Sequence, residues 1–176
     1  GFNARKQEDY VDICFMGLKG GSGAMDGVDG YDHIGMIDAS GGLLDQDYEM
    51  FEQQTPHRLV KHELSCDSAG AGQWRGGLGV RTEIVLGSDR TQLVTFGDGD
   101  VKPAFGLFGG REGTLNFIEL RKPDGTVYRP TSKDLVTGLP VETVFVQEAG
   151  GGGGFGDPHR RPAEIVAREV RDGSIS

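Results

Sequence analysis

Residues 150–158 read GGGGGFGDP, and this stretch stands between a strand-like run, VETVFVQEA, and a helix-like run, HRRPAEIVAREVRDG. Gly151, Gly153 and Gly156 satisfy the G-x-G-x-x-G spacing of loops that hold nucleotide phosphates with backbone N–H groups. The same glycines would also allow two backbones to approach where a side chain could not fit. The surrounding sequence decides between a nucleotide loop and a packing loop.

The neighbouring residues argue against a nucleotide loop. A P-loop has Lys followed by Ser or Thr after its last glycine, whereas Asp157 and Pro158 follow here. Asp157 would put negative charge beside the phosphate, and Pro158 offers no N–H group. A Rossmann unit also needs a second strand with an acidic residue about 20 residues further on, and only a helix-like run and DGSIS follow. We therefore interpret residues 150–156 as a loop for close backbone packing, against another element or another subunit.

Short strand-like runs separated by glycine and proline recur through the chain. Glycine supplies 31 of the 176 residues and proline 7, while hydrophobic residues make up only 36%. Short runs at intervals of roughly 8–12 residues are typical of sandwiches and distorted barrels. We expect a mainly β (α+β) fold of short twisted strands joined by glycine-rich turns. The expected strands begin near residue 59 and cover residues 82–86, 91–96, 115–120, 126–128 and 143–147.

Two segments carry helix signals. Residues 45–54 read DQDYEMFEQQ, and Asp45 is a suitable N-terminal cap for a short helix there. A second helix is expected near residues 162–172, because Pro162 suits its first turn and Gly173 suits its end.

Composition excludes several classes of partner. The formal net charge is -9, which argues against nucleic acid and against anionic membranes, because both bind clustered Lys and Arg. No apolar run approaches the ~18 residues of a membrane span. Cys14 and Cys66 cannot form a disulfide framework and form no C-x-x-C pair, so we expect two thiols of a cytoplasmic protein.

The stretch DGVDGYDH, residues 26–33, collects carboxylates and an imidazole. Its acidic residues are three apart, so it fails the alternate spacing of an EF-hand loop. Asp32 beside His33, with Asp38 close behind, could form an acid–base pair or contribute metal ligands. The alternative is a polar turn, which Asp and His also favour.

Two further sites stand out beside the glycines. Trp74 and Arg75 lie between glycine turns, and such residues are common anchors of interfaces, although a half-buried Trp with Arg stacked on its edge fits equally well. Gly153 and Phe155 belong to the glycine run. All four are candidates for lining a substrate chamber or an interface.

Longer motifs resemble one family. HELSCDSAGAGQWRGGLGVRTEI, residues 62–84, resembles the segment Y-E-L-x-x-D-S-G-G-A-G-x-W-R-G-G-L-G of the hydantoinase B/oxoprolinase family. GGGGGFGDPHRRPAEIVAREVRDGSIS, residues 150–176, resembles that family's C-terminal signature, G-G-G-G-Y-G-D-P followed by a helix. GGSGAMDGVDGYDHIGMIDASGGLLDQDYEMFEQQTP, residues 20–56, is similar to the ketone-carboxylase branch, namely acetone carboxylase α and acetophenone carboxylase. The hydrolytic branch tends to carry a His-x-His-Met-type segment here, which this chain lacks.

The resemblance implies a subunit of a cytosolic ATP-dependent hetero-oligomer. ATP would bind a hydantoinase A-type subunit with an actin-like ATPase fold, which phosphorylates an oxygen of the substrate. The B-type part would help to form the chamber where bicarbonate carboxylates the activated ketone, with Asp32, His33 and Asp38 as candidate lining residues. A divalent metal such as Zn or Mn belongs to the family, with ligands expected mainly in the N-terminal part of the B-type subunit or on a partner chain.

The same resemblance implies how the chain is organised. It covers about the C-terminal third of a full family member, so we expect a separately encoded or cleaved piece whose N-terminal complement is another chain. Residues 1–60 would be a glycine-rich segment that packs on the partner chain, and residues 61–176 the β-rich region of the B-type fold. Two alternatives remain open: a component of an ATP-dependent hydantoinase, 5-oxoprolinase or lactamase, and a structural subunit without catalytic side chains.

Overall fold

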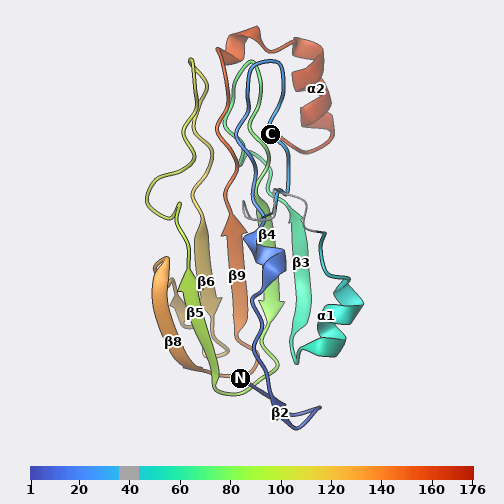
Figure 1. The fold of residues 1–176 in the computed structure, drawn as a ribbon, viewed down its shortest axis with the longest axis vertical. Coiled ribbons are helices and arrows are strands. Elements are labelled where there is room, and N and C mark those ends of the chain that lie inside the picture. Colours follow the sequence, from blue (N-terminus) through green and yellow to red (C-terminus); the bar gives the residue numbers. More distant parts are fainter. Residues whose placement is uncertain (36–43) are drawn as a thin grey trace.

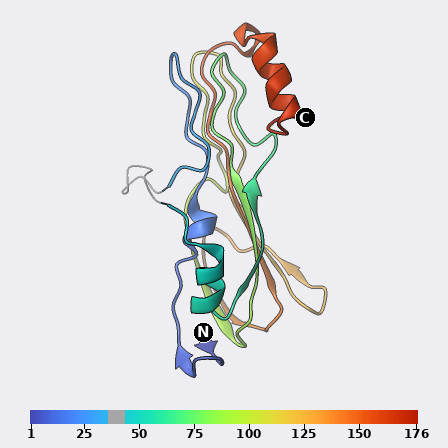
Figure 2. The ribbon, with the colours of Figure 1, turned by 90° about the vertical axis from the view of Figure 1, so that its right-hand side faces the viewer.

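The computed structural model describes residues 1–35 and 44–176. The chain is elongated: an antiparallel sheet fills one half, and extended glycine-rich segments run on from the strands to fill the other (Figures 1 and 2). The expectation of a mainly β fold with two helices is confirmed. No helix within the described residues is long and apolar enough to cross a membrane.

Five strands form the main sheet in the order β3-β4-β9-β6-β7, and all neighbouring pairs are antiparallel. Two shorter pairings, β1 with β2 and β5 with β8, stand beside it. The strands are β1 (Phe2–Asn3), β2 (Glu8–Asp9), β3 (Arg58–Leu64), β4 (Val80–Val85), β5 (Thr91–Phe96), β6 (Phe117–Arg121), β7 (Val127–Tyr128), β8 (Lys133–Leu139) and β9 (Val144–Ala149).

The two faces of the main sheet differ in chemistry, because successive side chains of a strand point to opposite sides. Ile84, Phe145 and Leu120 are register partners across three strands and are all buried. The next row, on the other face, pairs Val146 with Glu83 and Glu119, whose carboxylates bind Arg81 and Arg121 of their own strands. The first face therefore carries the core, and the second carries a network of ion pairs.

Residues outside the sheet complete the core. Met16 comes from the 3-10 helix η1 (Phe15–Leu18), Phe51 from helix α1 (Tyr48–Gln54), and Leu139 from β8. Residues 1–60, expected to pack on a partner chain, thus supply core residues to this chain's own sheet. Their contact with another chain stays a prediction.

The N-terminal cap of α1 is Asp47, whose side chain accepts a hydrogen bond from the backbone N–H of Met50 at 2.9 Å. The sequence-based expectation that Asp45 caps this helix is wrong. The helix starts at Tyr48, one residue after Asp47. From that position the Asp47 carboxylate reaches a backbone N–H group of the helix's first turn that has no partner inside the helix. Asp45 is therefore available for another role.

The second expected helix is confirmed as α2 (Ala163–Arg171), which follows the short 3-10 helix η3 (Pro158–Arg160). Pro162 occupies its N-terminal cap, and Gly173 ends it with a φ of 74°, which glycine adopts without strain. The helix lies beside the glycine-rich half, away from the N-terminus (Figure 1).

The glycine-rich half is a bundle of extended segments, which we call the glycine-rich bundle: residues 20–24, 29–31, 68–77, 104–114 and 150–156. Gly152 lies inside it and bonds two neighbours, donating to Gly77 O at 2.9 Å and accepting from Gly70 N at 2.8 Å. A Cβ on Gly152 would stand 1.8 Å from the carbonyl oxygen of Ser22. Only glycine fits where backbones come this close.

The bundle also accounts for the phosphate-like spacing of residues 150–156. Gly152 N, Gly154 N and Gly156 N donate to backbone carbonyls of Gly77, Arg111 and Leu107, each at 2.9 Å. The N–H groups that a phosphate would need are thus used inside the protein. The packing interpretation of this run is confirmed.

Candidate functional site

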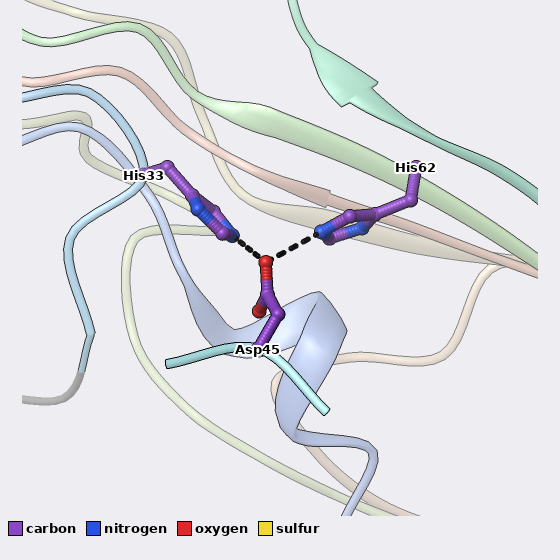
Figure 3. A group of neighbouring side chains, drawn as sticks. All are labelled: His33, Asp45 and His62. Carbon is purple, nitrogen blue, oxygen red and sulfur yellow. Dashed lines mark ion pairs between the residues drawn. The ribbon is translucent and has the colours of Figure 1, made fainter. Parts of the chain in front are cut away.

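Two imidazoles and one carboxylate converge at the point where the sheet meets the glycine-rich bundle (Figure 3). Asp45 Oδ2 lies 3.1 Å from His33 Nε2 and 3.4 Å from His62 Nε2. The ligand atoms of all three side chains lie within 4.8 Å of one another. We call His33, Asp45 and His62 the histidine–aspartate cluster.

His62 is the most firmly held member. It lies on β3 directly opposite Thr82 of β4, and its Nδ1 is 2.9 Å from Thr82 Oγ1. The ring also contacts those of His33 and Tyr48 edge-on, at centroid distances of 5.3 and 5.7 Å. Its side chain is only 6% exposed. Because Thr82 engages Nδ1, the Nε2 atom faces Asp45.

His33 comes from the loop that leads out of the bundle. Its φ is 52°, a left-handed conformation that is uncommon for residues other than glycine, although histidine adopts it more often than most. The next residue, Ile34, is fixed by a hydrogen bond from its N–H to Gly20 O at 2.7 Å. Burial lowers the pKa of His33, although the charge of Asp45 opposes this. The imidazole is therefore mainly neutral near pH 7.

Asp45 lies between the two histidines and a buried cation. Its Oδ1 is 2.6 Å from Nζ of Lys19, whose side chain is 3% exposed. Burial alone would raise the pKa of Asp45, but the hydrogen bond from Lys19 and the charge of His33 outweigh it, so the pKa is lowered. The carboxylate thus stays ionised, with one oxygen on Lys19 and the other toward the imidazoles.

This donor set supports two kinds of chemistry. Two imidazole nitrogens and one carboxylate oxygen are ligands that suit divalent transition metals. A neutral imidazole beside a carboxylate is also the pairing that general bases use, since the carboxylate orients the ring and stabilises its protonated form.

The residues expected to act together, Asp32, His33 and Asp38, are distributed differently. His33 joins the cluster. Asp32 instead accepts hydrogen bonds from the backbone N–H of Leu78 at 2.6 Å and from Nη1 of Arg75 at 3.3 Å. Asp38 lies outside the described residues.

The four candidates for a chamber or an interface belong to the glycine-rich bundle and its contact with α2. The backbones of Trp74 and Phe155 exchange hydrogen bonds at 2.9 and 3.0 Å. Gly153 O accepts from Ala24 N at 2.9 Å. Nε of Arg75 donates to Glu169 of α2 at 2.9 Å.

Sequence reasoning does not select Lys19, Asp45 or His62 for a site. It assigns Asp45 to a helix cap, and His62 stands alone in the sequence. The sequence does predict the two strands that carry His62 and Thr82. It does not predict the register between these strands, which is what places the two side chains opposite each other.

The fold and the site together define the class of protein: a glycine-rich chain of antiparallel β-structure with a half-buried histidine–aspartate cluster. The chain belongs to the hydantoinase B/oxoprolinase family, whose sequence profile matches residues 1–158.

Three comparisons show how far the likeness extends. The chain is 34% identical to the beta subunit of caprolactamase from Pseudomonas jessenii over 96% of its own length, and 26% identical to the B-type subunit of a putative D-/L-hydantoinase from Pseudomonas sp. strain NS671 over 99%. It spans only 30% and 29% of those two proteins. The crystal structure of the ATP-dependent caprolactamase from Pseudomonas jessenii superposes on the whole chain with a TM-score of 0.81 at 30% identity, covering 31% of that structure.

A structure of nucleotide-free acetone carboxylase has the same fold, with a TM-score of 0.76 at 21% identity over 90% of this chain and 25% of the carboxylase chain. The family part of the resemblance is therefore confirmed. The ketone-carboxylase branch stays a hypothesis.

Proposed function

We propose that this chain forms the C-terminal part of a B-type subunit in a cytoplasmic, ATP-dependent complex that opens a cyclic amide. The observation that carries this proposal is the 34% identity to the beta subunit of caprolactamase across almost the whole chain, together with the TM-score of 0.81 to the caprolactamase structure. Further support comes from a second curated relative, which is part of a putative hydantoinase, because hydantoins are also cyclic amides.

In this proposal ATP is held by an A-type subunit, which phosphorylates the amide carbonyl oxygen. Water then adds to the activated carbon in a chamber that the B-type subunit helps to form, the C–N bond of the ring breaks to free the amine, and a second water hydrolyses the resulting acyl phosphate to carboxylate and phosphate. The chamber has to stabilise the developing negative charge and keep out bulk water, because water attack at phosphorus would return the amide unchanged and waste the ATP. A chain supplying the N-terminal part of the B-type fold completes the hetero-oligomer.

The histidine–aspartate cluster is the group we assign to the chamber wall. His33 and Asp45 are 28% and 22% exposed as side chains, so a substrate or water molecule could reach them, while His62 is held from behind by Thr82. Asp32 would act only through Arg75 and the loop that it fixes. Asp38 lies outside the described residues and remains a candidate.

A second surface suits contact with a partner chain. Phe105 and Phe108 project from the glycine-rich bundle and are 76% and 79% exposed, and the ring of Phe108 packs on Phe155 at a centroid distance of 5.0 Å. Exposed aromatic side chains of this kind are frequent anchors of interfaces. We assign this end of the bundle, including Trp74 and Gly153, to an interface.

A second candidate is the ketone carboxylase, in which bicarbonate takes the place of water. Its support is the similarity of residues 20–56 to that branch and the lack of the His-x-His-Met-type segment. The two reactions share the ATP-dependent activation step and differ in the acceptor.

The test is ATP turnover by the complex purified with its native subunits. Caprolactam, hydantoin and 5-oxoproline should each be supplied without bicarbonate, and acetone and acetophenone with and without it. Turnover that follows a cyclic amide supports the proposal, and turnover that requires ketone with bicarbonate replaces it with the carboxylase. Normal assembly and unchanged turnover in a His33→Ala complex would leave the chain a structural role.

A further inference from the structure

We propose that His33, Asp45 and His62 bind a divalent transition-metal ion with the preferences of Zn²⁺. The proposal concerns the binding of an ion by these three side chains. It does not depend on which reaction the complex catalyses, so the experiment below tests it independently of the proposed function.

The spacing of the three ligand atoms fits one ion. Zn–N and Zn–O bonds are about 2.0–2.1 Å long, and tetrahedral geometry then puts neighbouring ligand atoms about 3.3 Å apart. The distances from Asp45 Oδ2 to Nε2 of His33 and of His62 are 3.1 and 3.4 Å. These two contacts match edges of such a tetrahedron, and all three ligand atoms lie within 4.8 Å of one another.

The hydrogen bonding of His33 supports the same interpretation. Its Nε2 atom is buried and lies 3.1 Å from Asp45 Oδ2 as an ion-pair contact, but among the described residues it makes no contact with hydrogen-bond geometry. Buried polar nitrogens are nearly always hydrogen-bonded. A nitrogen that lies this close to a carboxylate without bonding it is expected where both atoms point toward a common centre.

The surroundings hold the ligands as metal sites usually do. Ligating histidines normally use their other ring nitrogen in a hydrogen bond, and ligating carboxylates are themselves hydrogen-bonded. Nδ1 of His62 is 2.9 Å from Thr82 Oγ1, and Oδ1 of Asp45 is 2.6 Å from Lys19 Nζ. Both contacts orient the atoms that face the cluster.

The donor set also selects the kind of ion. Ca²⁺ takes about 6–8 oxygen ligands and Mg²⁺ prefers carboxylates and water, whereas imidazole suits Zn, Cu, Fe and Ni. Lys19 balances the single carboxylate, so the cluster offers little net negative charge to an alkaline-earth ion. Three protein ligands leave a fourth position open for water, as in catalytic zinc sites. The partial exposure of His33 and Asp45 gives that position a route to solvent.

The experiment is metal titration of the chelator-treated protein, purified with any subunits that accompany it. Zn²⁺ binding is measured by calorimetry and Co²⁺ binding by its visible d–d absorption, and each is compared among wild type, His33→Ala, His62→Ala and His159→Ala. His159 is an exposed histidine of η3, so its variant controls for loose surface binding. Circular dichroism and a thermal melt without metal check that each variant folds.

We expect one more equivalent of Zn²⁺ in wild type and His159→Ala than in the His33 and His62 variants, or a loss of affinity well above about 10-fold in the latter two. Zn²⁺ should also raise the melting temperature of wild type more than theirs. Equal stoichiometry and affinity in all four proteins would overturn the proposal. If either alanine variant fails to fold, anomalous scattering at the zinc edge from Zn²⁺-soaked wild-type crystals decides: a peak among the three side chains supports the site, and its absence refutes it.

Discussion

Arg161 donates two parallel hydrogen bonds to the carboxylate of Asp29, 132 residues earlier in the chain, each at 2.8 Å. The same guanidinium donates to Glu169 of α2 at 3.1 and 2.7 Å and is 7% exposed. Arg75 joins the group through Glu169. One arginine thus ties the loop of Asp29, in the glycine-rich bundle, to helix α2.

Replacing this arginine by an apolar residue should be strongly destabilising. Arg161→Met leaves the half-exposed Asp29 and the buried Glu169 with their contacts to Arg75 but without Arg161. Removing one partner of a fully buried pair typically costs about 3–5 kcal/mol, and we expect a loss at the lower end of that range. Urea denaturation of the variant measures this cost. Arg160→Met, at an exposed neighbouring position, should stay within about 0.5 kcal/mol of wild type. Similar losses in both variants would show that the Asp29–Arg161 contact is not what holds α2.

The glycine-rich bundle should not tolerate a single methyl group at its centre. Gly152→Ala would put a Cβ 1.8 Å from Ser22 O, a backbone atom that cannot rotate away, whereas Gly97→Ala meets nothing within 4 Å. We expect Gly152→Ala to lower the free energy of unfolding by more than about 3 kcal/mol, beyond the usual range for point substitutions, or to prevent folding. Gly97→Ala should be close to neutral. A thermal melt of the two variants compares them directly, and equal melting temperatures would contradict the close packing.

The sequence predicts those features of the fold that depend on residues close together in the chain, and fails for those that depend on residues far apart in it. Strand composition and glycine spacing indicate a mainly β chain with close backbone packing, because these signals are local. The cap of α1 is harder to place, since Asp45 and Asp47 are both good caps and only the backbone of the folded chain selects Asp47. His33 lies in a loop, Asp45 lies just before α1, and His62 lies on β3. The three come together only when the chain is folded. Local patterns do not encode such pairings, so the cluster could not be predicted.

Stability should fall with acid because of one buried histidine outside the cluster. Nδ1 of His57 accepts the N–H of Gly87 at 3.3 Å, its Nε2 bonds the hydroxyl of Tyr10 at 2.9 Å, and burial lowers the pKa of His57 to about 4. The unfolded chain, with a pKa near 6.5, binds the proton first. His57 therefore costs no stability above about pH 6.5 and progressively destabilises the fold as the pH falls from about 6.5 toward about 4.

The expected loss from His57 is about 2 kcal/mol between about pH 7.5 and about pH 5, on the scale of about 1.4 kcal/mol per pKa unit. Urea denaturation at several pH values measures it, and the same series on His57→Gln isolates it, because glutamine does not titrate. The difference between the two proteins should change with pH mainly between about pH 7 and about pH 4. Parallel curves would mean that His57 is protonated as readily in the folded chain as in the unfolded one.

The last prediction concerns the residue behind the proposed ion. Thr82 is fully buried and its hydroxyl holds Nδ1 of His62, so Thr82→Val keeps the ligand but releases its orientation. Loss of such a supporting contact typically costs about 10- to 100-fold in metal affinity. Thr143→Val is the matched control, because Thr143 is equally buried and, within the described part of the chain, its hydroxyl bonds only Pro140 O, at 2.8 Å.

Both valine variants should lose similar stability, since each removes one buried hydroxyl from a hydrogen bond. Only Thr82→Val should weaken Zn²⁺ binding, measured by competition with a chelator. A loss in both variants would trace the effect to general loosening of the sheet. Unchanged affinity in Thr82→Val would mean that the orientation of His62 does not matter for the ion, which is incompatible with His62 as a ligand fixed through its second nitrogen.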